Sequence, residues 1–157
     1  MQMNFVYESN ASRVVFGAGA AKHVRDEVAK LGARALVLST AFQKPDAERL
    51  AQHLGTLSAG VFAEAAMHPP VNVTEKALAA FQVTGADCLV SIGGGSTIGL
   101  GKAVAYRNNA PQIVLATTYA GSEVTPILGQ TENGIKTTIR DRTILPAVVI
   151  YDPELTI

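Results

Sequence analysis

Two hydrophobic periods alternate along the chain, and their order predicts repeated strand–helix units. Short apolar runs predict strands at residues 35–38, 60–63, 88–92 and 113–116. Apolar residues at helical spacing predict helices at residues 20–31, 45–54, 73–84 and 97–106. Two bounds have further support: Gly32 follows the first helix, where a C-terminal glycine is typical, and Pro45 lies in the first turn of the second.

The middle strands are continuous apolar runs, without the polar–apolar alternation of a half-exposed strand. Such runs are typical of strands that are covered on both faces, as in a parallel sheet between layers of helices. Because strands and helices follow each other in turn, the pattern predicts an α/β fold with a doubly wound, mostly parallel sheet and flanking helices. We expect residues 1–157 to form one such domain.

The two ends of the chain depart from this alternation. Residues 4–8 and 13–16 are rich in aromatic and β-branched residues, are separated by the polar segment 9–12, and predict an N-terminal β-hairpin. Residues 131–140 and 147–151 predict two further strands with no helix between them. The hairpin offers an edge strand to a second copy, so we expect a homodimer.

Composition and charge exclude several classes of protein. Hydrophobic residues make up 48% of the chain and charged residues 17%, which is typical of a globular domain. The formal net charge is zero, which argues against nucleic acid or an anionic membrane as partner. The sequence has no apolar run of transmembrane length and no signal-peptide pattern, so we expect a cytoplasmic protein. The single cysteine, Cys88, lies in an apolar run and is interpreted as a buried structural thiol.

A glycine-rich loop, Gly93-Gly94-Gly95-Ser96, joins the apolar segment 88–92 to a helical pattern. Ligands of open α/β sheets bind beyond the carboxyl ends of the strands, and glycines let the backbone approach them closely. The free N–H groups and the dipole of the helix can bind a pyrophosphate, and the Ser96 hydroxyl can cap the helix or donate to a phosphate oxygen. The alternative is a structural turn, but three consecutive glycines here favour a phosphate site.

Two other loops could also be either a ligand-binding site or a structural turn. Gly17-Ala18-Gly19 follows a strand and begins like a dinucleotide fingerprint, but Lys22 stands where the third glycine belongs. We interpret this segment as a tight turn into a helix. Residues 117–123 follow the strand 113–116, and their hydroxyl groups suit ribose, phosphate or amide contacts beside the glycine loop. Their composition fits an ordinary loop equally well.

The glycine loop and the loop after residue 116 together resemble a known family. Residues 93–102 resemble the Gly-Gly-Gly-Ser-x-x-Asp-x-x-Lys motif of the iron-containing (group III) alcohol dehydrogenase superfamily, and residues 116–123 resemble its Pro-Thr-Thr-x-x-x-Gly-Ser-Glu stretch. Gly99 replaces the usual aspartate, and this change, with residues 118–126 and 131–138, is similar to the maleylacetate reductase branch. The resemblance covers essentially the whole chain.

The resemblance implies an activity and a domain organisation. It implies an oxidoreductase that uses NADH or NADPH to reduce the carbon–carbon double bond of maleylacetate, a small dicarboxylate, to 3-oxoadipate in the degradation of aromatic compounds. It also implies that residues 1–157 are the NAD(P)-binding domain of a truncated chain. The missing part would be an all-helical domain with the metal ligands and the catalytic residues. We therefore expect little turnover from this chain alone.

Two alternatives to this function stay open. One is the corresponding domain of an iron-type alcohol or lactaldehyde dehydrogenase, although that branch uses the aspartate that Gly99 replaces. The other is a nucleotide-binding module without catalysis.

The resemblance also implies roles for individual residues. The implied cofactor-binding residues are Gly93, Gly94, Gly95 and Ser96 at the pyrophosphate, Thr117 and Thr118 at the adenosine half, Leu155 near the adenine, and Ser39 with Thr40 where the cofactor is usually selected. A carboxylate at this last position favours NAD. Its absence predicts that NADH and NADPH are both accepted. Lys102 either supports the site electrostatically or extends to solvent.

Tyr119 and Gly99 are candidates for residues near the substrate, and a packing role for Tyr119 fits equally well. Our hypothesis for Gly99 is that loss of the aspartate removes charge repulsion toward a dianionic substrate; the alternative is that the helix needs the space. The histidines His23, His53 and His68 have no partner at ligand spacing, so no metal site is predicted in this chain. Only His68, near the expected cofactor edge, is a candidate functional residue.

Overall fold

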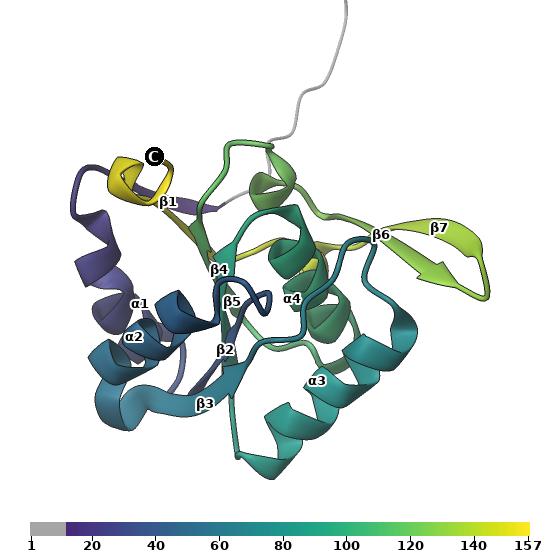
Figure 1. Ribbon diagram of the computed structural model, residues 1–157, viewed down its shortest axis with the longest axis horizontal. Helices are drawn as coiled ribbons and strands as arrows, with labels where there is room; N and C mark the ends of the chain where they lie inside the picture. Colours follow the sequence, from purple (N-terminus) through teal and green to yellow (C-terminus); the bar gives the residue numbers. More distant parts are fainter. Residues whose placement is uncertain (1–11) are drawn as a thin grey trace, which may run out of the picture.

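The computed structural model describes residues 12–157 and contains a six-stranded sheet in which all neighbouring strands are parallel (Figure 1). The strand order is β1-β8-β5-β4-β2-β3. These strands are β1 (Arg13–Phe16), β8 (Val148–Tyr151), β5 (Gln112–Ala116), β4 (Cys88–Gly93), β2 (Ala35–Leu38) and β3 (Ser58–Phe62). The predicted, mostly parallel sheet is therefore confirmed.

Helices cover both faces of the sheet. Those on one face are α1 (Val24–Leu31) and α2 (Lys44–Leu54), and those on the other face are α3 (Val71–Val83) and α4 (Gly95–Asn108). Successive residues of a strand point to opposite layers: Val37 of β2 packs with α1 and α2, whereas Leu36 and Leu38 pack with α3 and α4. The central strands are therefore buried on both faces, which explains their continuous apolar runs and confirms the doubly wound fold.

The direction of winding reverses between β2 and β4. From β2 the chain continues outward to β3, whereas from β4 it continues the other way to β5. The two intervening helices, α2 and α4, lie on opposite faces, so the loops that lead to them diverge. Such a switch point leaves a crevice outside the carboxyl ends of the strands, where ligands of this fold class bind. Here the switch point lies between residues 39–43, which follow β2, and the glycine loop 93–96, which follows β4.

The sequence predicts a single strand at residues 131–140, and this prediction is wrong. The segment belongs to an antiparallel hairpin of β6 (Ile127–Glu132) and β7 (Ile135–Arg140), which projects from the domain (Figure 1). Asn133 and Gly134 form its turn, with φ angles of 52° and 76°. Asn-Gly with positive φ at both positions is a preferred two-residue hairpin turn, and it reverses the chain inside the predicted strand.

The remaining elements agree with the predictions to within a few residues, with two qualifications. The helix predicted at residues 20–31 begins as a 3-10 turn, Ala20–His23, before α1 starts. Of the predicted N-terminal hairpin, residues 13–16 form β1, which pairs in parallel with β8, and residues 4–8 lie outside the described residues. Within residues 12–157, no helix is long and apolar enough to cross a membrane.

Candidate nucleotide-binding site

The glycine loop occupies the start of α4, directly at the switch point. β4 ends at Gly93 and α4 begins at Gly95, with Gly94 as its N-cap. Among the residues that the structure describes, no side chain caps this helix, and its first backbone N–H groups have no acceptor within the helix itself. A Cβ atom on Gly95 would meet nothing within 4 Å, so the space in front of the helix is open. This end of α4 can therefore accept an anion through its N–H groups and its dipole.

The other two glycines have close neighbours. A Cβ atom on Gly93, whose φ is 150°, would lie 2.6 Å from Oγ1 of the fully buried Thr97. A Cβ atom on Gly94 would lie 3.1 Å from Cγ2 of Thr118. The N–H of Thr117 donates to the carbonyl of Gly93 at 3.0 Å. The structure thus brings both predicted threonines against the glycine loop.

Gln43 is a residue of this site that the sequence reading missed. Its Nε2 donates to Oγ1 of Thr117 at 3.3 Å, and its Oε1 accepts from Oγ1 of Thr40 at 3.4 Å. The same Oε1 would lie 2.7 Å from a Cβ atom on Gly93. Gln43 therefore bridges the ends of β2 and β5 across the end of β4. The sequence carries no signal of this contact, because Gln43 reads locally as the residue before an amphipathic helix.

Two cavities flank the glycine loop. The first, of about 390 Å³, is bordered on one side by Gly95, Ser96 and Gly99 of α4. His68 from the loop after β3 and Lys136 from β7 are the ionisable groups that line it. The remaining lining residues are Met67, Pro69, Ser122, Ile127, Leu128 and Gly129. The predicted residues Ser96, Gly99 and His68 therefore meet in one mainly apolar cavity.

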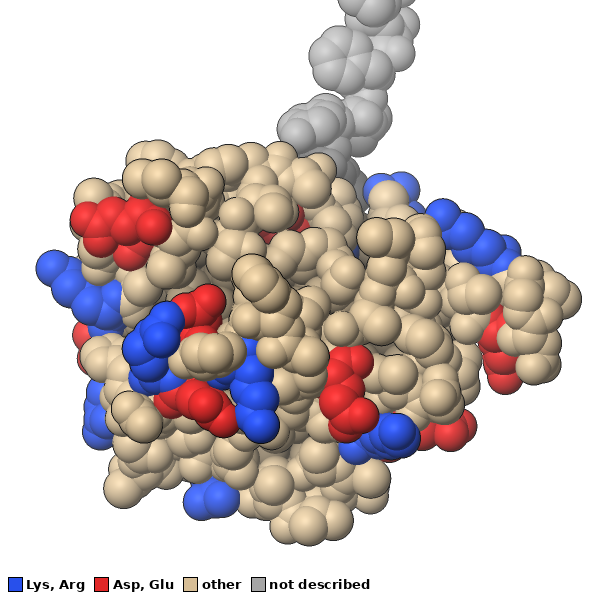
Figure 2. All heavy atoms as spheres, viewed as in Figure 1, with Lys and Arg blue, Asp and Glu red and all other residues tan. Residues whose placement is uncertain are grey.

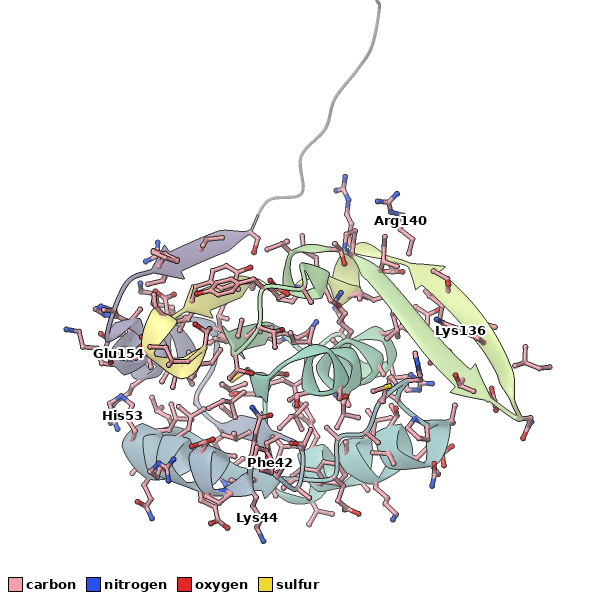
Figure 3. All side chains as sticks on the ribbon, turned by 45° about the horizontal axis from the view of Figure 1, so that its top comes forward. Phe42, Lys44, His53, Lys136, Arg140 and Glu154 are labelled. Atoms are coloured by element: carbon pink, nitrogen blue, oxygen red, sulfur yellow. The ribbon has the colours of Figure 1, made fainter. Side chains whose placement is uncertain are left out.

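The second cavity, of about 330 Å³, begins on the other side of β4. Ile92, the residue before the glycine loop, contributes to its wall together with Leu115 of β5 and Leu155. The other lining residues are Ala21, Lys22, Asp46, Arg49, Leu50 and His53. Figure 3 shows Lys136 of the first cavity and His53 of the second on opposite sides of the molecule. The glycine loop therefore lies between two cavities, each of which holds predicted site residues.

The charges around the site do not form a field of one sign. Figure 2 shows acidic and basic side chains interspersed over the viewed face, in keeping with a formal net charge of zero. Recognition of an anion at the glycine loop would therefore depend on local backbone dipoles and not on the overall charge.

For Lys102, on α4, the sequence left two alternatives: electrostatic support of the site or extension to solvent. Its side chain does not extend to solvent, because the residue is only 1% exposed. The ammonium group donates to the hydroxyl of Thr125 at 3.0 Å and to the carbonyl of Ile127 at 2.9 Å. Burial lowers the pKa of Lys102 to about 8, although the negative charge of Glu123 acts to raise it.

Two further predicted residues line neither cavity. Ser39 is fully buried, and its hydroxyl donates to the carbonyl of Thr40 at 3.0 Å. Tyr119 is 58% exposed and stacks on Tyr151 with ring centroids 5.5 Å apart. The hydroxyl of Tyr151 in turn donates to the buried Glu123 at 2.6 Å. Tyr119 therefore has a packing contact in this structure, whereas the half-buried Thr40 donates to Gln43 at the switch point.

The three histidines are exposed and dispersed over the domain. In the part of the chain that the structure describes, no group of three or more His, Cys, Asp and Glu residues could hold a metal ion. Cys88 is free and buried, and burial together with the negative charge of Asp87 raises the pKa of its thiol to about 12. The thiol therefore stays protonated at neutral pH, as expected of a structural cysteine.

The doubly wound sheet and the open helix start at its switch point define a Rossmann-like α/β domain. The family model for iron-containing alcohol dehydrogenase matches residues 11–153, and the chain belongs to this family. The family inferred from the two loops is therefore confirmed.

The chain is similar to relatives that are much longer than itself. It is 64% identical over 154 residues to a maleylacetate reductase of Rhizobium sp. (strain MTP-10005), which covers 98% of this chain and 44% of the relative. The crystal structure of maleylacetate reductase from Agrobacterium tumefaciens superposes with a TM-score of 0.96 at 63% identity, over 99% of this chain and 45% of that one. The chain thus spans less than half the length of these oxidoreductases.

A more distant solved relative is bound to a nucleotide. Sulfoacetaldehyde reductase from Bifidobacterium kashiwanohense, in complex with NAD⁺, matches with a TM-score of 0.85 at 27% identity, over 99% of this chain and 48% of that one. The name of the family also implies iron, but residues 12–157 bring no set of metal ligands together. The residues that the structure describes therefore do not fit a metal.

Proposed function

We propose that this chain is the NAD(P)H-binding domain of an enzyme that reduces maleylacetate. The observation that carries the proposal is the open, uncapped start of α4 at the switch point, between two cavities. A dinucleotide has two nucleoside halves joined by a doubly charged pyrophosphate. It therefore needs an anion site flanked by two cavities, and the glycine loop offers that arrangement.

Different residues of the chain would bind different parts of the dinucleotide. The N–H groups at Gly95 and Ser96 would hold the pyrophosphate against the helix dipole. The apolar walls of the second cavity, including Leu155, would hold the adenine, and the first cavity would hold the nicotinamide half. Thr117 and Thr118 close the loop from the β5 side. When bound, the cofactor would supply the hydride for the reduction; the chain binds and orients it.

The substrate is proposed from the relatives and from Gly99. The two relatives named first above are maleylacetate reductases, which supports maleylacetate over a simple alcohol or aldehyde. Gly99 lines the first cavity, so an aspartate there would place a carboxylate close to a dianionic substrate. Space also matters, because a Cβ atom on Gly99 would lie 3.3 Å from Cδ of Pro69. Both the charge and the packing explanations of Gly99 are therefore compatible with its position.

The proposed binding mode is tested by filling the open space in front of α4. In Gly95→Val the new Cβ atom meets nothing within 4 Å, so the fold should persist, but the side chain would occupy the place of the pyrophosphate. We expect NADH and NADPH affinity, measured by fluorescence titration, to fall at least about a hundredfold, since an anion contact of this kind contributes several kcal/mol.

The matched control is Ala79→Val, which adds the same side chain at an exposed position of α3. It should bind NADH as the unmodified chain does. Binding can also be followed through amide chemical shifts of residues 93–96 in the unmodified chain. If NAD(P)H leaves those amides unchanged, or if Gly95→Val binds normally, the proposed function is wrong.

A further inference from the structure

Lys102 is a buried cation that ties together two segments of the chain. It lies on α4, two turns beyond the glycine loop, and is 1% exposed. Its ammonium, with three N–H donors, lies within hydrogen-bond distance of four oxygen atoms: the carbonyl of Ser122, the hydroxyl of Ser122 at 3.1 Å, the hydroxyl of Thr125 at 3.0 Å and the carbonyl of Ile127 at 2.9 Å. All four acceptors belong to the segment 122–127, which joins the loop after β5 to the hairpin.

The partners of Lys102 are neutral groups. Across the described part of the chain, Lys102 forms no ion pair with a carboxylate. The carboxylate of the nearby Glu123 forms hydrogen bonds with other groups: it accepts from the hydroxyl of Tyr151 at 2.6 Å and from the N–H of Gly121 at 3.1 Å. A buried ammonium is costly unless its hydration is replaced by other oxygens. The four acceptors supply that replacement, so the geometry of the segment is coupled to the lysine.

The segment held by Lys102 forms part of a wall of the first cavity. Ser122 and Ile127 line that cavity from one side, and Gly95, Ser96 and Gly99 line it from α4. Lys102 belongs to the same helix as the latter group and bonds directly to the former. It therefore fixes the distance between the two walls. The second cavity has no wall that Lys102 contacts.

We infer that Lys102 is a positioning residue that holds the segment 122–127 against α4 and thereby shapes the nicotinamide half of the cofactor site. The inference rests on the proposed function. It predicts that Lys102 affects the binding of the nicotinamide half of the dinucleotide and does not affect the binding of the adenosine half. The adenosine half and the pyrophosphate are bound by groups that Lys102 does not contact.

The test compares a whole cofactor with a ligand that lacks the nicotinamide half. Lys102→Met keeps the length and apolar stem of the side chain and removes its donors. The matched control is Lys76→Met on α3, where the lysine is exposed and pairs with the exposed Glu64. NADH and ADP are titrated into the unmodified chain and both variants. For Lys102→Met we expect NADH affinity to fall about tenfold and ADP affinity to stay within about twofold, because only the nicotinamide wall is released.

A uniformly structural role for Lys102 would weaken NADH and ADP binding equally, and that result would overturn the inference. Equal binding of both ligands by Lys102→Met and the unmodified chain would also overturn it. If the unmodified chain binds neither NADH nor ADP, the proposed function fails first. Should Lys102→Met not fold, Thr125→Val decides: it removes one acceptor of the ammonium, and the same selective loss for NADH is expected at a smaller size, about threefold.

Discussion

Two loops of this chain place a Gly-x-Gly sequence between a parallel strand and a helix. They differ in whether another part of the protein accepts hydrogen bonds from the N–H groups at the start of the helix. Gly17–Gly19 follows β1 at the edge of the sheet, and Gly93–Gly95 follows β4 at the switch point. In the first loop, the N–H groups of Gly19 and Ala21 donate to the carboxylate of Asp152, at 3.1 and 3.0 Å. In the second, the N-cap Gly94 has no side chain, and within residues 12–157 no other side chain accepts from the first N–H groups of α4.

The difference supports the proposal that the second loop is a ligand site, whereas the first is a structural turn with a similar sequence. Asp152 is 2% exposed, and although burial acts to raise its pKa, its bonds with backbone N–H groups bring that pKa below the usual 3.8. The first loop thus already holds an anion that is part of the protein. The second loop has equivalent donors and open space, which leaves them to an external anion.

The largest expected effect comes from removing the internal anion. Asp152→Ala leaves the N–H groups of Gly19, Ala21 and Glu154 without their acceptor. Hydrogen bonds to a buried carboxylate are strong, and their loss leaves three backbone N–H groups without an acceptor. We therefore expect the free energy of unfolding to fall by about 4 kcal/mol. Urea denaturation of the variant and the unmodified chain measures this difference. A loss below about 1 kcal/mol would show that the first loop does not depend on its own anion.

Asp152→Asn supplies a control with the same shape and no charge, and it should lose less stability than Asp152→Ala. It also gives a pH signature. Because the pKa of Asp152 is lower in the folded state than in the unfolded one, its stabilisation is present above pH 3.8 and is lost as the pH falls through the folded-state value. The stability difference between the unmodified chain and Asp152→Asn should therefore shrink in acid. A difference that stays constant down to pH 3 would contradict this assignment.

A smaller effect is expected from a pair of glycine substitutions, one in each loop. Gly17 and Gly93 have nearly the same φ, 156° and 150°, so both substitutions carry similar backbone strain. A Cβ atom on Gly17 meets nothing within 4 Å, whereas one on Gly93 lies 2.6 Å from Thr97 and 2.7 Å from Gln43. We expect Gly17→Ala to cost about 1 kcal/mol and Gly93→Ala about 3 kcal/mol of unfolding free energy. Equal losses in thermal or urea denaturation would mean that crowding at the switch point has no role.

The sequence predicted the parts of this architecture that depend on local patterns. The continuous apolar runs and the glycines between strand and helix are short-range signals, and the doubly wound sheet and the position of the glycine loop follow from them. The hairpin β6–β7 had a short-range signal too, Asn133-Gly134, but the β-branched residues around it read as one long strand. A turn sequence inside a strand pattern should have taken precedence.

The sequence could not predict contacts between distant segments. Asp152 lies 133 residues from Gly19, and Gln43 lies 74 residues from Thr117. The partners of Lys102 are 20 to 25 residues away, on a segment whose path depends on the hairpin that was misread. The sequence therefore identified the loop that is open, but not the internal groups that close the other loop or shape the cavity.

The smallest effect is expected from placing a carboxylate beside the loop Gly93–Gly95. This loop would then resemble Gly17–Gly19, which already has the carboxylate of Asp152 beside it. Thr40 is the suitable position, because its Oγ1 already accepts from the N–H of Gln43 at 3.3 Å and an aspartate can keep that bond. The unmodified chain has no carboxylate there, so we expect its affinities for NADH and NADPH to agree within about tenfold. Thr40→Asp should weaken NADPH about tenfold through repulsion of the 2′-phosphate and leave NADH nearly unchanged.

Thr40→Asn has the same shape without the charge and should keep the original preference, which separates repulsion from crowding. Ser39→Ala separates the two neighbouring candidates: Ser39 is buried and bonded to its own chain, so its substitution should not alter the ratio of NADPH to NADH affinity. A change of that ratio in Ser39→Ala would move the selecting role to Ser39. A hundredfold preference of the unmodified chain for NADH would contradict the premise itself, because a neutral hydroxyl at this position gives no reason to reject a phosphate.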